Sequence, residues 1–126
     1  MPGDVELLLV ILRDHGKIAG RKRFQKIVFL LQRKYNVNIK YKFIPYLFGP
    51  YSKALQTDIN LLSFLGLTSV RPTMPYLHTL TPKGLQKAWE IEQKMNKDEL
   101  KKILCAVKEM KELSTDTMTK MAKSIM

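Results

Sequence analysis

Residues 21–67 have the sequence RKRFQKIVFLLQRKYNVNIKYKFIPYLFGPYSKALQTDINLLSFLGL. The stretch begins with the pattern of a basic amphipathic helix and continues through an aromatic segment that ends in Phe48-Gly49-Pro50-Tyr51-Ser52. It closes with a second apolar helix, which Gly66 ends because glycine readily adopts the left-handed conformation found after a helix. The order predicts two helices separated by an aromatic strand and a tight turn.

A strand pair and a further helix follow this stretch. Leu67 to Arg71 and Tyr76 to Leu80 can pair as a hairpin across Pro72-Thr73-Met74-Pro75. Thr81 can cap the next helix with Pro82 at its first position, where the missing N–H costs nothing. Together these elements predict a mainly α fold with a small β-wing, namely a winged helix-turn-helix plus carboxyl-terminal helices.

The first helix is predicted to begin at Asp4 and to run through about His15. The carboxylate of Asp4 can accept hydrogen bonds from the free amides of the first turn, and Gly16 suits the exit. Leu7 to Leu12 is an unbroken apolar run, as expected of a central helix. Lys17 to Ala19 is then a short connector or a strand.

The basic amphipathic helix should run from about Arg21 to Tyr35. Steps of about 100° per residue place five apolar side chains on one face: Phe24, Ile27, Val28, Leu31 and Tyr35. Lys22, Lys26 and Arg33 fall on the opposite face. This basic stripe is either the solvated side of a core helix or a surface that contacts phosphates.

The aromatic segment predicts a half-buried strand over residues 39–44. Lys40 and Lys42 share one face of it, and Pro45 places the strand at an edge or weakens it. The residue before a proline avoids the helical conformation, so Gly49-Pro50 forces a bend. Ser52 can then cap the next helix.

The helix from about Lys53 to Leu65 occupies the recognition-helix position of a winged helix. It is predicted to bury four side chains: Leu55, Ile59, Leu62 and Leu65. Four polar side chains remain as candidate base contacts: Lys53, Gln56, Thr57 and Asn60. The candidate phosphate contacts are Lys22, Lys26, Arg33, Lys40, Lys42, Arg71 and Lys83.

Two more helices complete the chain. The helix that Thr81 caps should bury Leu85, Ala88, Trp89 and Met95. Asn96 and Glu99 resemble a capping box for a helix through Leu113. This helix carries an apolar stripe that predicts contact with a second copy of the chain: Leu100, Ile103, Leu104 and Val107. The alternative is that the stripe and the methionines after it fill the core of one chain.

Length and charge narrow the class of protein. The 126 residues suit one compact domain, with a winged-helix part over residues 1–95 and a helical extension over residues 96–126. The net charge is +11, and residues 1–42 contribute ten basic against three acidic side chains. This excess favours an anionic partner, and nucleic acid is the foremost candidate.

The apolar runs, the amino terminus and the single cysteine indicate the compartment and whether the chain associates with a membrane. The longest apolar run is far shorter than a membrane span of roughly 18 residues, and the amino terminus does not resemble a signal peptide. The lone Cys105 predicts packing in a reducing compartment. We therefore expect a cytoplasmic protein without membrane association.

Catalytic and metal sites are not predicted. His15 and His78 lack zinc-site or triad-like spacing and fit a helix end and a strand. Asp58 with Glu92-Gln93-Lys94 superficially resembles a nuclease site, but alternate residues of a helix point about 200° apart. We expect no enzymatic activity, no metal and no cofactor.

Several segments resemble one known family. They are Phe24-Gln25-Lys26-Ile27-Val28-Phe29-Leu30, Phe48-Gly49-Pro50-Tyr51-Ser52, Asp58, Leu61-Leu62, Gly66-Leu67 and Leu80-Thr81-Pro82-Lys83-Gly84. They are similar to the Panacea (SocA-like) antitoxin family and the related phage-associated and archaeal proteins of YwgA type. The resemblance covers roughly residues 24–113 and implies a winged-helix fold, with antitoxin or regulatory roles in some members. It brings no catalytic residue.

Two functional classes follow from the sequence. The first is a DNA-binding winged helix, a transcriptional regulator that forms a homodimer and docks the helix of Lys53 to Asn60 in a groove of duplex DNA. The second is an antitoxin-like or adaptor module, which binds a protein partner through residues 48–51 and the carboxyl-terminal helices. An acidic partner accounts for the charge equally well.

Overall fold

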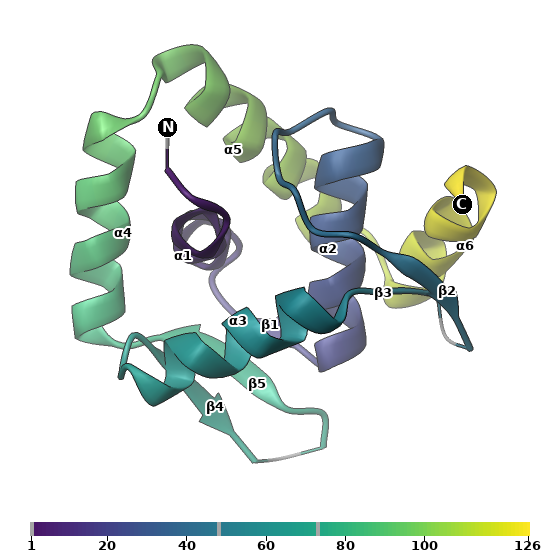
Figure 1. Cartoon of the computed structure of the whole chain (residues 1–126), viewed down its shortest axis with the longest axis horizontal. Coiled ribbons are helices and arrows are strands. Elements are labelled where there is room, and N and C mark those ends of the chain that lie inside the picture. The colour runs from purple at the N-terminus through teal and green to yellow at the C-terminus, as the bar shows by residue number, and fades with distance from the viewer. Residues whose placement is uncertain (1, 48, 73) are drawn as a thin grey trace.

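The computed structural model describes residues 2–47, 49–72 and 74–126. This part of the chain is mainly helical with short antiparallel strands, as predicted (Figure 1). The helices are α1 (Asp4–His15), α2 (Arg21–Arg33), α3 (Lys53–Phe64), α4 (Pro82–Lys94), α5 (Lys97–Lys111) and α6 (Thr115–Ile125). The strands are β1 (Ile18–Ala19), β2 (Ile44–Tyr46), β3 (Gly49–Tyr51), β4 (Thr68–Arg71) and β5 (Leu77–Leu80).

Within the described residues, the strands form two small antiparallel sheets. One has the order β1–β5–β4, and the other pairs β2 with β3. The hairpin predicted from residues 67–80 is the β4–β5 pair, although Thr73 at its tip lies outside the described residues. β1 confirms the strand alternative for residues 17–19 and places Ile18 opposite His78.

α1 passes through the middle of the molecule, where α3, α4 and α5 pack against it (Figure 1). Residues 7–12 are all buried, which confirms the prediction of a central helix. The prediction that Asp4 caps the helix is wrong. Gly3 is the N-cap, and its N–H donates to Glu6 Oε1 at 3.0 Å. The carboxylate of Asp4 instead accepts a hydrogen bond from the backbone N–H of Lys40.

α2 is buried on almost every side, because α5, α6 and β3 pack around it. The prediction that Lys26 lies on an exposed basic stripe is wrong, since only 4 % of this residue is exposed. A Cβ placed on Gly49 would lie 3.3 Å from the Lys26 Cε, so β3 covers the lysine stem. Lys22 and Arg33 are exposed, as predicted. Four predicted core residues are buried: Phe24, Ile27, Val28 and Leu31.

The predicted strand at residues 39–44 is wrong, although its pattern of burial is present. Ile39 and Tyr41 are buried, whereas Lys40 and Lys42 are exposed. Three backbone groups of this extended segment bond to side chains instead of to another strand. Gln32 Nε2 donates to the carbonyl oxygens of Ile39 and Tyr41, each at 2.7 Å. Strand pairing begins only at β2, whose first residue, Ile44, is the last residue of this segment.

Ser52 caps α3 as predicted. Its Oγ accepts from the N–H of Leu55 at 3.2 Å, and the buried Gln25 bonds both the N–H and the carbonyl of Ser52. Gly66 has φ +75°, which confirms the left-handed stop. Three predicted core residues are buried: Leu55, Ile59 and Leu62. The prediction that Leu65 is buried is wrong, because 47 % of it is exposed.

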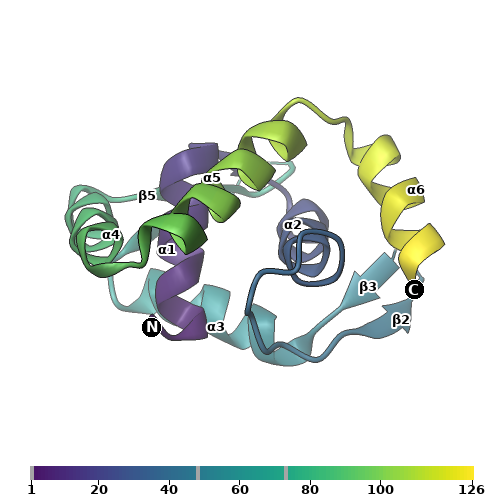
Figure 2. The same ribbon diagram turned by 90° about the horizontal axis from the view of Figure 1, so that it is seen from above.

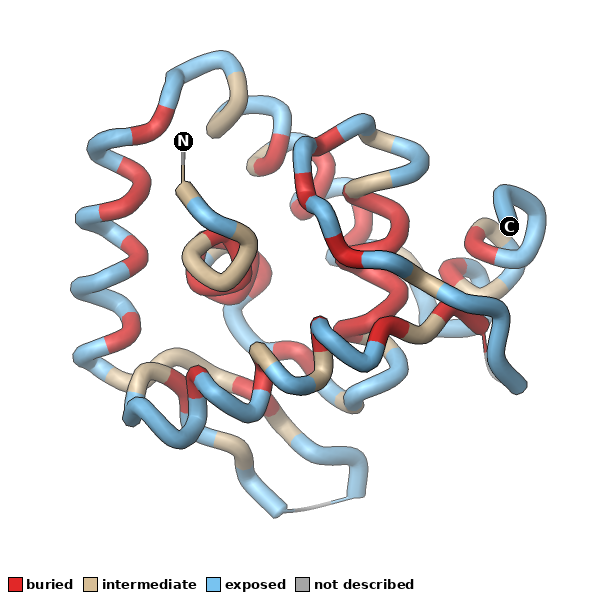
Figure 3. The backbone as a smooth tube through the Cα atoms, viewed as in Figure 1, coloured by how far each residue is buried: buried red, intermediate tan, exposed pale blue. Residues whose placement is uncertain are grey.

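α4 begins as predicted, because Thr81 Oγ1 accepts from the N–H of Gly84 at 3.1 Å. Of the four residues predicted to form its buried face, only two are buried. Ala88 and Met95 are buried, but Leu85 and Trp89 are 46 % and 47 % exposed. The side of the helix that faces α1 is the buried one (Figure 3). Gly84 lets this side approach the backbone of residue 67 closely, which turns the two large side chains outward.

α5 confirms its predicted cap, since Asn96 Oδ1 accepts from the N–H groups of Asp98 and Glu99. The prediction that the apolar stripe of this helix contacts a second copy of the chain is wrong for two of its four residues. Ile103 and Val107 are 2 % and 1 % exposed within the core of the same chain, because α5 covers α1 and α2. The other two members of the stripe are half-buried: Leu100 and Leu104.

Of the other residues predicted to pack in the carboxyl-terminal part, two are fully buried and one is exposed. Met110 and Met118 are fully buried, so α6 completes the core over α2. Cys105 is exposed, which makes the prediction that it packs in the core wrong.

An ionic cluster joins the end of α1 to α4. Arg13 donates to Glu92, and the carboxyl of Asp14 lies nearby with its Oδ2 buried and unpartnered among the described residues. Burial, and next the negative charge of Glu92, raises the pKa of Asp14 to about 6. The folded state therefore favours the protonated carboxyl.

We expect Asp14→Asn to stabilise the fold at high pH only. The pKa of Asp14 is higher in the folded state than its ordinary value of 3.8, so the stability that it contributes is complete below pH 3.8. That stability is lost as the pH rises through about 6. After allowance for solvent screening of this half-buried group, the variant should gain about 1 kcal/mol at about pH 8 and nothing at about pH 3.5. Urea denaturation at both pH values measures this, and an equal effect at both would contradict it.

Candidate nucleic-acid interface

The outward face of α3 carries the four candidate base contacts. Lys53, Thr57 and Asn60 are exposed and Gln56 is half-buried, as a one-sided helix requires. Gln56 Nε2 donates to Asn60 Oδ1 at 3.1 Å, and Thr57 Oγ1 donates to the carbonyl of Lys53 at 3.1 Å. These bonds lie at the surface, where a ligand can exchange with them.

A groove of about 920 Å³ lies beside the amino-terminal end of α3. It runs between that end and the extended segment of residues 40–46, and we call it the lysine groove. Lys40, Lys42 and Lys53 line it together with Tyr46 and Tyr51. The tertiary structure thus brings two predicted phosphate contacts to a predicted base contact.

A second groove, of about 290 Å³, adjoins the β2–β3 hairpin and shares two lining residues with the lysine groove. It contains Arg21, and we call it the Arg21 groove. Lys22 and Gln56 line it, and so do the same two tyrosines, Tyr46 and Tyr51. The guanidinium carbon of Arg21 lies 4.5 Å from the ring centroid of Tyr76, so the aromatic ring orients this cation.

The remaining predicted phosphate contacts lie elsewhere. Lys26 is buried under β3. Arg33 lies in the last turn of α2, with its guanidinium carbon 5.3 Å from the ring centroid of Phe29. Lys83 Nζ donates to the carbonyl of Leu65 at 3.3 Å and so caps the carboxyl end of α3. Arg71 is exposed on β4, in the β4–β5 hairpin.

Arg21 and Tyr46 were not identified as site residues from the sequence, and Tyr51 was included only in the loop of residues 48–51 predicted to bind a protein partner. The β2–β3 pairing brings the two tyrosine rings to a centroid distance of 5.6 Å. One signal could have pointed to them, namely the alternation of lysines and aromatic residues over residues 40–46. α3 and the β2–β3 hairpin lie along one edge of the molecule, opposite α5 (Figure 2).

The carboxyl-terminal half of α3 differs in chemistry from the amino-terminal half. Leu61, Phe64 and Leu65 are 41 %, 87 % and 47 % exposed. Apolar side chains of this kind cannot form hydrogen bonds with base edges. The polar and basic surface is therefore confined to the first two turns of α3 and the hairpin beside them.

The two histidines lie at the end of α1 and on β5, as predicted. The ring of His78 packs edge-on against Phe24 at 5.4 Å, and both of its nitrogens are buried without a partner among the described residues. His15 Nδ1 contacts the carbonyl oxygen of Lys17 at 2.9 Å. Burial lowers the pKa of both imidazoles, so both remain neutral near neutral pH. Their surroundings are those of packing residues.

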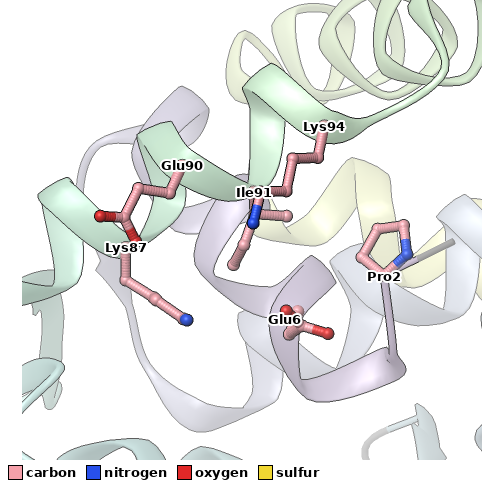
Figure 4. A pocket seen from close by; sticks show the side chains of 6 residues that line it. All are labelled: Pro2, Glu6, Lys87, Glu90, Ile91 and Lys94. Atoms are coloured by element: carbon pink, nitrogen blue, oxygen red, sulfur yellow. The ribbon is translucent and has the colours of Figure 1, made fainter.

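A pocket of about 220 Å³ lies between the amino terminus and α4 (Figure 4). Glu6 and Glu90 line it together with Lys87 and Lys94, so its charges balance. Such a mixed lining selects neither an anion nor a cation. Within the described residues, no cluster of three potential metal ligands occurs, and no helix is both long and apolar enough to cross a membrane.

Comparison with known proteins finds no match among protein-family models, curated proteins or solved structures. The resemblance to the antitoxin family therefore stays a prediction.

Proposed function

We propose that this chain is a winged-helix protein that binds double-stranded DNA and regulates transcription. The observation that carries the proposal is the convergence of Lys22, Lys40 and Lys42 on the amino-terminal half of α3, where Lys53 is exposed and Gln56 is half-buried. Phosphates are held by such cations and by helix amino termini, while Gln and Asn side chains can bond adenine edges.

The order of elements supports the winged-helix interpretation. α1, β1, α2 and α3 precede a hairpin of β4 and β5, and β1 pairs with that hairpin. One feature departs from a simple helix-turn-helix, whose turn has about three or four residues. Residues 34–52 separate α2 from α3 and include the β2–β3 hairpin. The hairpin adds a second projection beside α3.

We expect salt-sensitive binding to duplex DNA of arbitrary sequence. If about three phosphates are contacted, affinity should fall tenfold or more between about 50 and 200 mM salt. The double variant Lys42→Gln/Lys53→Gln should reduce the slope of log affinity against log salt by about 2, because each lost phosphate contact lowers it by about 1. Fluorescence anisotropy with a labelled duplex measures both quantities.

A matched control removes the same charge from the opposite edge of the molecule. Lys97→Gln/Lys101→Gln changes two exposed lysines of α5 and should leave the slope within experimental error. If this control lowers the slope as much as the groove variant does, binding depends only on overall charge. If the parent chain does not bind duplex DNA at about 50 mM salt, the proposed function is wrong.

A second candidate function is antitoxin-like or adaptor binding to a protein partner. The exposed Leu61, Phe64 and Leu65 favour it, because large exposed apolar side chains mark protein interaction surfaces. Phe48, which belongs to the partner loop predicted from the sequence, lies outside the described residues. Absence of duplex binding in the anisotropy series would favour this second function.

A further inference from the structure

The two tyrosines of the hairpin form an exposed aromatic ridge. Tyr51 lies opposite Ile44 in the register and Tyr46 opposite Gly49, so the two tyrosines are diagonal neighbours on one face. Their ring centroids are 5.6 Å apart with planes at 37°, and Tyr46 is 62 % exposed. A flat ring held by a neighbouring ring and open to solvent can accept another flat ring on its free side.

Cations flank this ridge on both sides. Lys40, Lys42 and Lys53 line the lysine groove on one side, and Arg21 and Lys22 line the Arg21 groove on the other. Tyr46 and Tyr51 line both grooves, so the ridge separates them. The result is a basic surface that continues across an aromatic centre.

The carboxylates in the lysine groove do not cancel its charge. Asp58 Oδ2 accepts from the hydroxyl of Tyr41, and Asp4 accepts from the backbone N–H of Lys40. These bonds hold both carboxylates against the protein. Three lysines therefore outnumber two engaged carboxylates in this groove, and none of the described residues that line the Arg21 groove is acidic.

We infer that this ridge and its two grooves bind single-stranded nucleic acid, with a base stacked on Tyr46 and the flanking phosphates on the lysines and Arg21. The inference deepens the proposed function, because it assigns single strands to the same face that is proposed to bind the duplex. Bases in a duplex are stacked on one another, so only unpaired nucleotides can place a base on the ring. Aromatic platforms inside basic grooves are the recurrent solution for single strands.

Anisotropy with a labelled oligothymidylate of about ten nucleotides tests the inference at low salt. Tyr46→Ala should lower affinity for this oligonucleotide about tenfold, since one stacked base is lost. The same variant should leave affinity for the duplex within about twofold, because the phosphate contacts remain. Tyr46→Phe should bind the oligonucleotide like the parent, because the phenyl ring still stacks.

Trp89→Ala is the matched control, since Trp89 is a large aromatic residue, 47 % exposed, on α4 and lines neither groove. It should change neither affinity. Circular dichroism of each variant shows whether it is folded. Should Tyr46→Ala be unfolded, Lys42→Gln supplies the test, and it should lower the salt slope for the oligonucleotide by about 0.7.

Each outcome separates the two proposals. Binding of the oligonucleotide without the duplex contradicts the proposed function and leaves the single-strand inference standing. Binding of the duplex alone overturns the inference and supports the proposed function. Equal loss in Tyr46→Ala and Trp89→Ala also overturns the inference, because the ridge would then contribute nothing specific.

Discussion

Gly84→Ala is expected to destabilise the fold by about 3 kcal/mol. A Cβ on Gly84 would lie 1.9 Å from the carbonyl oxygen of Leu67, far inside van der Waals contact. That oxygen cannot move cheaply, because it accepts the backbone N–H of Thr81 at 3.1 Å. The hydroxyl of Thr81 also donates to the carbonyl of Gly66 at 2.7 Å, which ties α4 to the same backbone.

A loss of stability would be the opposite of the usual effect, because replacing glycine by alanine within a helix normally stabilises it by about 1 kcal/mol. Urea denaturation should show the loss, and the melting temperature should fall by about 10 °C or more. Lys87→Ala in the same helix is the control, since Lys87 is exposed and should change stability by less than about 0.5 kcal/mol. A Gly84→Ala variant as stable as the parent would show that α4 does not approach residue 67 so closely.

Ile103→Ala is expected to cost about 3 kcal/mol, because it removes buried methyl groups and leaves a cavity. Ile103 is 2 % exposed and lies in the same core cluster as Leu8 and Val107. Ile103→Glu should abolish folding, since an unpaired carboxylate in this position has no partner to compensate its desolvation. Chemical denaturation and circular dichroism measure the two results.

Cys105, two residues further along the same helix, provides the control because it is exposed. Cys105→Ala should change stability by less than about 0.5 kcal/mol. Light scattering adds a second readout, in which the folded Ile103→Ala variant should have the mass of the parent. If Ile103→Glu instead remains folded and halves the mass of the parent, the stripe on α5 is an interface between two copies.

Local signals in the sequence located most of the helix ends. Ser52, Thr81 and Asn96 were identified as caps, and each accepts a hydrogen bond from an N–H of the first turn. Gly16 and Gly66 were identified as stops, and both have positive φ. These predictions succeeded because a cap or a stop depends on residues within one helical turn. Asp4 failed because it is the first helical residue after the N-cap Gly3, and its carboxylate accepts instead from the backbone N–H of Lys40, a residue distant in the sequence.

Part of the candidate site followed from the same local reasoning. The polar face of α3 could be predicted, because Leu55, Ile59 and Leu62 fix which side of that helix is buried. The exposed positions of Lys40 and Lys42 followed from alternation. The tyrosine ridge could not be predicted, because the strand was expected five residues too early and the β2–β3 register was therefore unknown.

Sequence alone determined the mainly helical class, the central position of α1 and the hairpin of β4 and β5, because apolar runs, caps and turn residues act over short distances. Tertiary structure alone decided that Lys26 is buried, that Trp89 is exposed and that Ile103 belongs to the core of its own chain. These outcomes depend on which distant segments cover a helix: β3 and α6 cover α2, and the backbone of residue 67 sets the rotation of α4. An apolar face in the sequence shows that one side of a helix must be buried. The packing of the whole chain decides which elements, and how many of them, cover it.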